Sequence, residues 1–333
     1  MLYRPILKKA LWISWKNKFL WIFGFFVMLF LNNGIPNLFE FYFRIESFFK
    51  FSILATKFQF LQSVQFKEFF LNTQKLFLAN PFISILIFLF ILLIFFLFVW
   101  LSIVSQASLI GSVERINSKK VPSLKEGFRE GKVFFWPLFV LNFLAKLFIF
   151  GLMIIFIFPL VFFIQLQKSS FWLDFLFLFG LVILFFLDIV ISFFTFYASA
   201  FVVLKKERVL QVIKKAWLLF LKNWLISLEM AFILLFVFIL SGLALFLVLI
   251  FFSLPFVLLA IIFHYFAFTF GFNLVFNFAL IFLIIILILF ASFLAVFGIS
   301  SWVLLFIELT KKEKKISKLI RLFGCRFTKK MLS

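Results

Sequence analysis

The feature that most restricts the fold of this chain is a series of apolar runs, several of them about 30 residues long. A helix crosses the hydrocarbon core of a bilayer with about 20 apolar residues, so each run is long enough for one crossing. Of the 333 residues, 66% are hydrophobic and 14% are charged, which excludes a disordered chain and an ordinary soluble domain. We therefore predict an all-α, polytopic helical membrane protein, with residues 1–333 in a single integral membrane domain.

Three segments rich in lysine and aromatic residues, here called the basic-aromatic segments, each come just before a long apolar run. They are Lys9–Trp21, Lys125–Pro137 and Lys215–Ser227. Each contains two lysines that lie about two helical turns apart, on one helix face. Lysine extends toward lipid phosphates and tryptophan prefers the headgroup region, so these segments predict headgroup contacts at the membrane interface. The residues expected to make them are Lys9, Lys16, Trp21, Lys125, Lys132, Trp136, Lys215, Lys222 and Trp224.

Six transmembrane helices, paired as three hairpins, account for the apolar runs. We expect the spans at about 19–33, 81–113, 134–167, 175–204, 223–252 and 280–308. Because a basic-aromatic segment precedes each hairpin, the hairpins could be parallel repeats of one unit. The alternative is that any helix entering a membrane from the cytoplasm is basic and aromatic. Residues 37–80 mix aromatic and charged side chains, which is typical of an amphipathic loop, here on the extracytoplasmic side.

The stretch between the fifth and sixth spans allows two interpretations. Ser253-Leu254-Pro255 predicts an interruption, because proline does not continue the hydrogen bonding of a helix. Residues 256–279 are apolar but contain polar side chains such as His264 and Asn273. They would form either a re-entrant or interfacial hairpin, or a seventh span that moves the C-terminal tail to the opposite side of the membrane.

The net charge of +21 flanks the apolar spans and does not form one patch. With six spans, the segments on one side hold 5, 6, 6 and 9 lysines and arginines, and those on the other side hold 5, 1 and 0. The positive-inside rule then predicts a bacterial inner-membrane protein with both termini in the cytoplasm, including the basic tail at 310–333. Anionic lipids of the bilayer are the expected partners, other membrane proteins come second, and nucleic acid is not expected.

Three charged residues lie within apolar runs: Lys146, Asp188 and Glu229. A charge that faces lipid costs at least about 2.5 kcal/mol, so these side chains should face the bundle interior or water. Counted from the basic loops, the depths of Lys146 and Asp188 differ by about 5 Å, within reach of a lysine side chain. We predict a Lys146–Asp188 ion pair, with Glu229 as the alternative partner. The pair would either fix helix register or line a path for substrate or protons.

The residues offer no basis for catalysis, and no cofactor or metal is expected. His264 is expected outside the cytoplasm and Cys325 inside it, so the two cannot form a dyad. One histidine and one cysteine are too few for a zinc site. No nucleophile elbow, phosphate-binding loop or zinc-protease helix motif occurs. Glu126 and Glu130 lie beside other charges and are interpreted as a solvated surface.

The order of the basic-aromatic segments along the chain resembles that in a known group of bacterial membrane proteins. The sequence WISWKNKFLWIFG at 12–24, EGFREGKVFFW at 126–136 and KKAWLLFLKNW at 214–224 carry the resemblance, together with the long first outer loop. It is similar to the membrane domain attached to some glycerophosphodiester phosphodiesterases and to stand-alone multi-pass relatives of that domain. The resemblance implies a six-helix membrane domain. It implies no activity, because the chain has no room for the catalytic barrel of those enzymes.

Two classes of function fit these observations. The leading hypothesis is a non-enzymatic accessory or scaffold domain that organises lipids or partner proteins. The competing hypothesis is a transporter or permease component, with Lys146, Asp188 and Glu229 along a substrate path. A lipid-modifying enzyme ranks third, because it would need a cluster of polar residues at one interface that the sequence does not contain.

Overall fold

The computed structural model describes residues 3–30, 81–120, 122–165, 171–266 and 268–311. Every regular element in these ranges is an α-helix, as predicted. Helices suit this composition, because they satisfy their backbone hydrogen bonds internally where hydrocarbon offers no partner. The predicted loop at 37–80 and nearly all of the basic tail at 310–333 lie outside the described residues.

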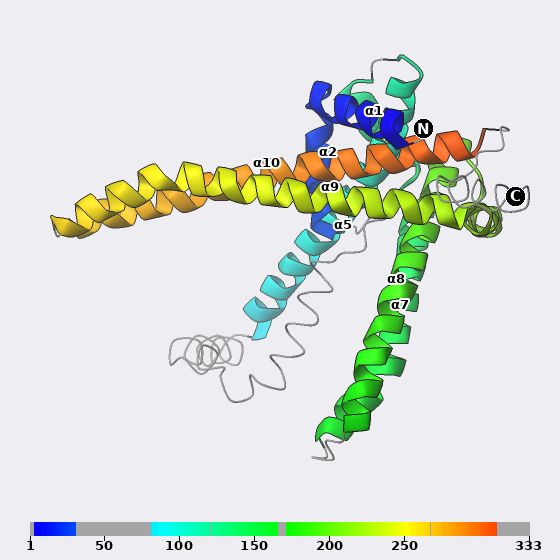
Figure 1. The fold of residues 1–333 in the computed structure, drawn as a ribbon, viewed down its shortest axis with the longest axis horizontal. Helices are drawn as coiled ribbons and strands as arrows, with labels where there is room; N and C mark the ends of the chain where they lie inside the picture. The colour runs from blue at the N-terminus through cyan, green and yellow to red at the C-terminus, as the bar shows by residue number, and fades with distance from the viewer. Residues whose placement is uncertain (1–2, 31–80, 121, 166–170, 267, 312–333) are drawn as a thin grey trace, which may run out of the picture. The chain divides into compact units, whose positions relative to one another are not determined.

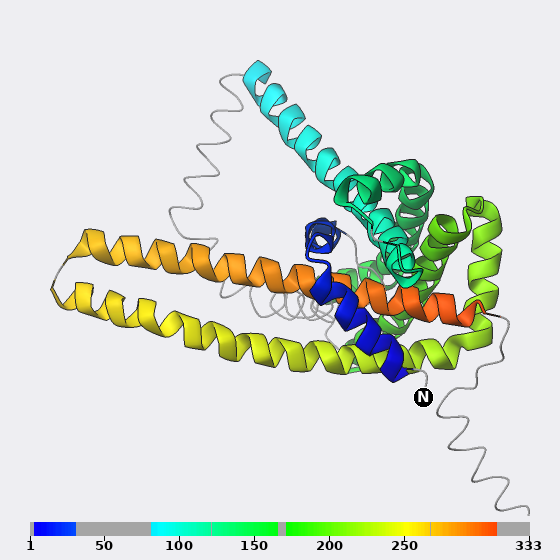
Figure 2. The same ribbon diagram turned by 90° about the horizontal axis from the view of Figure 1, so that it is seen from above.

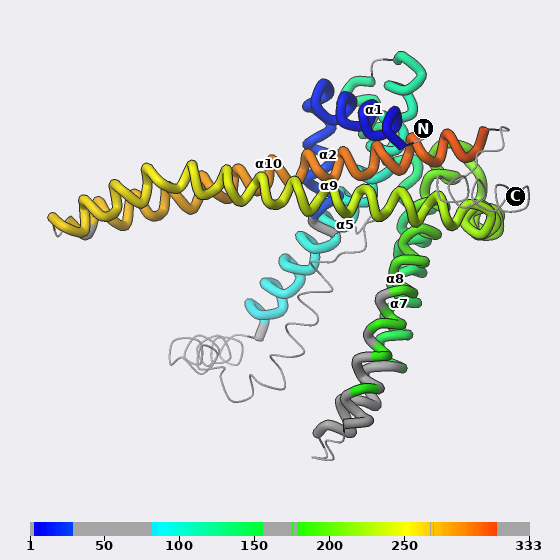
Figure 3. The backbone as a smooth tube through the Cα atoms, in the orientation of Figure 1, coloured from blue at the N-terminus to red at the C-terminus, as the bar shows by residue number. Residues whose placement is uncertain are grey.

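Figure 1 labels the described helices other than α6, and Figure 3 follows the same backbone as a tube. The helices are α1 (Tyr3–Lys16), α2 (Leu20–Phe30), α5 (Pro81–Asn117), α6 (Leu124–Val133), α7 (Phe135–Gln165), α8 (Phe171–Lys205), α9 (Val209–Tyr265) and α10 (Thr269–Leu309). In the described ranges, five of them are long and apolar enough to cross a membrane: α5, α7, α8, α9 and α10. These helices are those of a multi-pass membrane protein.

The five long helices coincide with the predicted second to sixth spans, with α7 (Phe135–Gln165) beginning one residue later than the predicted 134–167. α2 coincides with the predicted first span, but its 11 residues extend only about 16 Å, roughly half the thickness of the hydrocarbon core. The chain that follows, residues 31–80, lies outside the described ranges. The number of six spans therefore stays a prediction.

The predicted interruption at Ser253-Leu254-Pro255 is wrong. α9 continues through Pro255 to Tyr265, and the one residue with non-helical dihedral angles inside it is Asn223 (φ −127°, ψ 24°). Proline deprives a carbonyl one turn earlier of its donor, and nearby hydroxyl groups relieve this loss in membrane helices. The Ser253 hydroxyl donates to the carbonyl of Ile250 at 2.8 Å in that part of the helix. α9 therefore tolerates the proline and does not end there.

α9 and α10 form a long antiparallel hairpin, which both views show (Figures 1 and 2). Its turn lies between Tyr265 and Thr269, where the backbone N–H of Phe268 donates to the carbonyl of Phe263 at 2.9 Å. Residues 256–279 are thus the adjoining ends of two helices. They form neither a separate re-entrant element nor a helix of their own.

Contacts divide the chain into two units, residues 1–35 with 102–333, and residues 36–101. In the second unit the described part is the first half of α5, which exposes apolar side chains such as Phe82 and Phe90. In the first unit α7 packs against α8, α8 against α9, and α9 against α10. α1 and α2 both pack against α10, so the pairing of the first and second spans stays a prediction.

The buried core of the first unit lies at the end of the helices where the basic residues gather. We call this end, formed by α1, α6, the start of α9 and the C-terminal ends of α5, α8 and α10, the basic end. Farther from it, α9 and α10 expose apolar side chains such as Phe246 and Phe276, as lipid contact requires. Core residues at the basic end include Ala10, Leu20, Ile110, Leu138, Tyr197, Val212, Met230, Trp302 and Leu305.

Candidate functional site

The three basic-aromatic segments fold in the same way. Each forms a short helix, breaks just after its second lysine and continues as a longer apolar helix. The breaks follow Lys16, Lys132 and Lys222 and lie at Asn17–Phe19, Phe134 and Asn223. Each break thus begins one or two residues after the second lysine, so the three segments have a similar backbone conformation as well as the same spacing of lysines.

Two of the breaks use an asparagine in the same manner. The side-chain amide of Asn17 donates to the carbonyl of Ile13 at 2.9 Å, and that of Asn223 donates to the carbonyl of Leu219 at 3.1 Å. In both cases the amide bonds the carbonyl four residues earlier, and at Asn17 that carbonyl also accepts the backbone N–H of the same residue at 3.2 Å. Asparagine competes with helical hydrogen bonds in this way, so the helix bends there. At the second break the backbone N–H of Phe134 donates to Gly131 instead.

The first and third segments also bury equivalent positions. Counted from the first lysine of each segment, three small or apolar residues of α1 match three of α9, and all six are buried against the core. These residues are Ile6, Ala10 and Ser14 in α1 and Val212, Ala216 and Phe220 in α9. The second segment differs, because its buried positions are two glycines, Gly127 and Gly131.

All six lysines predicted to contact headgroups are exposed. Two of them lie over an aromatic ring one turn earlier: Lys16 Nζ is 4.9 Å from the centre of the Trp12 ring, and Lys132 Nζ is 4.7 Å from that of Phe128. A ring face attracts an ammonium group and so directs each lysine along the helix surface. Two of the predicted tryptophans are also open to the surroundings, with Trp136 70% and Trp224 53% exposed.

Trp21, the third predicted tryptophan, also has partners within the protein. Its indole N–H donates to the carbonyl of Ser14 at 2.8 Å, across the break between α1 and α2. Its ring meets that of Phe293 on α10 edge-on, with the ring centres 5.7 Å apart. Trp21 therefore holds the bend between α1 and α2 against α10, whatever it contacts in the bilayer.

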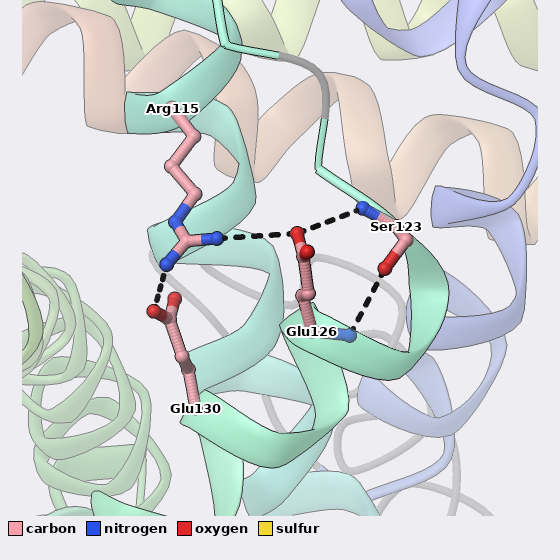
Figure 4. A network of polar contacts seen from close by, with 4 residues as sticks. All are labelled: Arg115, Ser123, Glu126 and Glu130. Carbon is pink, nitrogen blue, oxygen red and sulfur yellow. Dashed lines mark hydrogen bonds and ion pairs between the residues drawn. The ribbon is translucent and has the colours of Figure 1, made fainter.

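A charged network joins α6 to α5 (Figure 4). The guanidinium of Arg115 pairs with Glu130 and, at 3.5 Å, with Glu126. Glu126 and Ser123 also form a capping box at the start of α6, in which each side chain accepts a hydrogen bond from the other backbone. Of these glutamates, interpreted from the sequence as a solvated surface, Glu126 is exposed and Glu130 is partly exposed, and both fix α6 to the end of α5.

Two glycines of α6 allow close packing on α5. A Cβ atom at Gly131 would collide with the Ser108 hydroxyl and the Val104 carbonyl, and one at Gly127 would lie 3.0 Å from the Ser112 hydroxyl. Glycines four residues apart commonly mark close helix contacts in membranes. The Gly-x-x-x-Gly spacing at 127–131 is present in the sequence and indicates a close helix contact, which was not predicted.

The three intramembrane charges occupy different surroundings. Lys146 and Asp188 lie on α7 and α8, which pack against each other, with Lys146 exposed and Asp188 partly exposed. Their ion pair stays a prediction. Glu229, on α9, accepts a hydrogen bond from the hydroxyl of Tyr3 on α1. The sequence did not indicate Tyr3, because it lies outside the expected spans and 226 positions away.

A buried polar network links α5, α7 and α8 at the basic end. The amide of Asn142 donates to the side-chain oxygen of Gln106 at 2.9 Å, and the Gln106 amide reaches the Ser199 hydroxyl at 3.5 Å. Asp188, Ser192, Thr195 and Ser199 recur on α8 at helical spacing and so share one face. Polar side chains therefore run along α8 from Asp188 to this network.

Several other buried polar groups lie in this core. The hydroxyls of Tyr197 and Ser227 bond each other at 2.6 Å across α8 and α9. Five buried side-chain atoms have no hydrogen-bond partner among the described residues: the hydroxyls of Ser102, Ser112 and Ser300, one carboxylate oxygen of Glu207, and the indole N–H of Trp302. Buried polar groups normally find a partner, so these mark places where water or a ligand could bond.

No protein-family model matches the chain, and neither a curated protein nor a solved structure is significantly similar to it. Among the described residues, no three His, Cys, Asp or Glu side chains lie where they could hold a metal ion. The fold and the surroundings of the site thus define only the class of protein: a multi-pass helical membrane protein in which most of the described basic residues lie at one end.

Proposed function

We propose that this chain is a non-enzymatic accessory or scaffold domain of the bacterial inner membrane, which organises lipids or partner proteins at its basic end. Three short helices with exposed lysines would lie at the membrane surface, and the long helices would hold them there. Both termini would be cytoplasmic, as the positive-inside rule expects for the lysine-rich side.

One observation carries the proposal: the break that follows the second lysine of all three basic-aromatic segments. A bend at that point lets the lysine-bearing helix follow the membrane surface while the next helix enters the hydrocarbon. A single such bend could serve packing alone. Three bends with exposed lysines at one end of the molecule favour a surface built for lipid headgroups.

The test replaces the second lysine of each segment. A triple variant with Lys16→Gln, Lys132→Gln and Lys222→Gln should retain much less phosphatidylglycerol during purification, since each lysine near an anionic surface contributes about 1 kcal/mol. Retained lipid is measured by mass spectrometry of the purified protein. A matched variant carrying Lys8→Gln, Lys120→Gln and Lys214→Gln should lose less, because these lysines lie outside the lysine pairs. Equal losses in the two variants would contradict the proposal.

A transporter is the second candidate, and the polar face of α8 favours it. Asp188, Ser192 and Thr195 lead toward the buried Gln106–Asn142 contact, and such continuity is typical of a hydrophilic path. Labelling of carboxylates in intact membranes separates the two candidates. Modification of Asp188 by a water-soluble reagent, absent in an Asp188→Asn variant, would favour transport, and protection of Asp188 would favour the accessory role.

We also propose that the resemblance to the membrane domain of glycerophosphodiester phosphodiesterases reflects a similar accessory role. The partner would then be an enzyme of that class, bound through the basic end. A gene for such an enzyme beside this one would support the proposal, and co-purification of the two proteins would test it directly.

A further inference from the structure

The C-terminal ends of three helices enclose a hollow at the basic end. α5, α8 and α10 contribute its walls, and its volume is about 280 Å³. This is near the lower limit of ligand pockets, so it suits a small group and not an extended molecule. None of the basic-aromatic segments lines it. It is therefore a second feature of the basic end, and it meets the basic-aromatic segments where Lys9 bonds its lining residue Asn117.

The walls of this hollow differ in polarity. Leu204, Phe306 and Ile307 supply apolar atoms, while the remaining lining residues carry charges, amides or hydroxyls. The hollow also lies where the apolar runs of the three helices end, which is the level of lipid headgroups for a chain spanning a bilayer. An apolar wall beside a polar one fits a molecule that has both parts, as a phospholipid does.

The polar wall carries one negative and one positive side chain that do not pair with each other. Glu114 accepts a hydrogen bond from the Ser118 hydroxyl at 3.1 Å, and within the described residues no cation lies within ion-pair distance of it. Lys205 likewise has no carboxylate partner in that part of the chain. A charge of each sign is therefore available to a ligand.

Further groups strengthen the positive side of the wall. Asn117 accepts a hydrogen bond from the Lys9 ammonium through its side-chain oxygen, and among the described residues its amide N–H groups have no acceptor, so they can donate to a ligand. Thr310 and Lys311 complete the lining, with Lys311 also 2.7 Å from Glu308. Amide and ammonium donors of this kind bind phosphate oxygens.

From this arrangement we propose that the hollow binds an ethanolamine-phosphate group, with Glu114 facing the primary ammonium and Lys205 and Asn117 facing the phosphate. A primary ammonium can donate hydrogen bonds to Glu114, whereas the trimethylammonium of a choline group cannot. An anionic headgroup without a cation would be repelled by the carboxylate of Glu114. The inference rests on the proposed lipid-organising function and names the class of lipid bound at a site apart from the basic-aromatic segments.

Native mass spectrometry of the full-length chain in detergent tests the proposal. Equal amounts of phosphatidylethanolamine, phosphatidylcholine and phosphatidylglycerol are added, and bound lipids are counted. The wild-type chain should retain phosphatidylethanolamine about tenfold better than phosphatidylcholine, because only phosphatidylethanolamine can form the hydrogen bond to the charged Glu114. Glu114→Gln should abolish that preference, and Lys205→Gln should weaken binding of both lipids. Equal retention of the three lipids by the wild type, or an unchanged preference in Glu114→Gln, would overturn the proposal.

Controls separate binding from folding and from general charge effects. Lys205→Arg should restore binding, while Lys214→Gln, an exposed lysine outside the hollow, should leave it unchanged. Soluble phosphoethanolamine provides a further arm: displacement of the lipid at equal concentration identifies the free compound as the ligand, and no displacement identifies the lipid. Phosphatidylglycerol retention by the triple lysine variant is measured independently, so either proposal can fail without the other.

Discussion

Two lysines hold a backbone conformation that glycine usually supplies. Lys119, after α5, and Lys206, after α8, have φ values of 60° and 54°. After α5 the backbone N–H groups of Lys119 and Lys120 bond the carbonyls of Ile116 and Arg115, which is the Schellman arrangement at a helix end. This left-handed backbone conformation ends the helix. It is strained in lysine, because the Cβ atom lies too close to the following carbonyl oxygen.

Relieving that strain should stabilise the protein. We expect Lys119→Gly to raise the free energy of unfolding by about 0.5–1 kcal/mol, because glycine adopts positive φ without steric cost and the left-handed form costs other residues about 1–2 kcal/mol. Thermal unfolding in detergent, followed by circular dichroism, measures the change. Lys214→Gly is the control: it lies inside α9 and should destabilise by about 1 kcal/mol. A loss of stability in Lys119→Gly would contradict the assignment.

Tyr3 and Glu229 form the contact that ties α1 to α9. Burial raises the pKa of the Tyr3 phenol well above its usual range, and its hydrogen bond to Glu229 raises this pKa further. The phenol therefore stays protonated at neutral pH. Its titration should not change the free energy of unfolding in that pH range. The hydroxyl keeps its role as a donor.

Removing this donor should cost stability. We expect Tyr3→Phe to lower the free energy of unfolding by about 1–3 kcal/mol, because a partly buried acceptor loses a hydrogen bond. Tyr265→Phe is a matched control, since Tyr265 is 85% exposed at the end of α9. Equal melting temperatures for Tyr3→Phe and the wild type would show that the contact contributes nothing.

At the scale of the elements, close packing of α6 on α5 depends on Gly131. A Cβ atom there would collide with α5, whereas one at Gly242 would meet nothing within 4 Å. Gly131→Ala should therefore destabilise by about 1–3 kcal/mol through overpacking. Gly242→Ala should be neutral or stabilise by up to about 1 kcal/mol, since alanine favours a helix. Melting temperatures in detergent check both; a Gly131→Ala variant as stable as Gly242→Ala would refute the packing.

Some helices and breaks could be predicted from the sequence and others could not, depending on which sequence feature encodes them. Apolar length predicted the five long helices, because hydrocarbon forces any such run to be helical. The breaks that follow Lys16, Lys132 and Lys222 were not predicted, because the lysine pairs indicated only contacts with the membrane interface. The interruption at Pro255 was wrong because a proline in a long apolar helix loses only one hydrogen bond, and nearby groups compensate for it.

The site was harder to predict because its contacts join residues far apart in the chain. Trp21, assigned to headgroups, also packs on Phe293, and Glu229 bonds Tyr3. No local pattern encodes such pairs. The Gly127–Gly131 spacing was visible in the sequence, and it is the one signal that would have located the α5–α6 contact in advance.

For the whole molecule, the length of the α9–α10 hairpin has the largest consequence. At about 1.5 Å per residue, the 41 residues of α10 extend about 60 Å, roughly twice the thickness of the hydrocarbon core. A tilt of 40°, the upper limit for most membrane helices, would still leave the hairpin too long. Most of its surface is nonetheless apolar up to the turn, where Phe266 is 73% exposed, although His264 and Asn273 are also exposed there.

We therefore expect the turn of this hairpin to lie against lipid and not in water, because so long an apolar surface is unfavourable in water. In a Cys325→Ser background, Phe266→Cys should resist a water-soluble maleimide added to open membranes. Lys214→Cys, in a charged and exposed part of α9, should react under the same conditions. Equal labelling of the two cysteines would show that the turn projects into water.

The central claim is that the basic-aromatic segments mark one face of the membrane. Reporter fusions test it most directly, because they place chosen points of the chain on one side or the other. A reporter after residue 120, just before the second segment, and a reporter after residue 333 should both be active only on the cytoplasmic side. Reporters at these two points that lie on opposite faces of the bilayer would contradict the account.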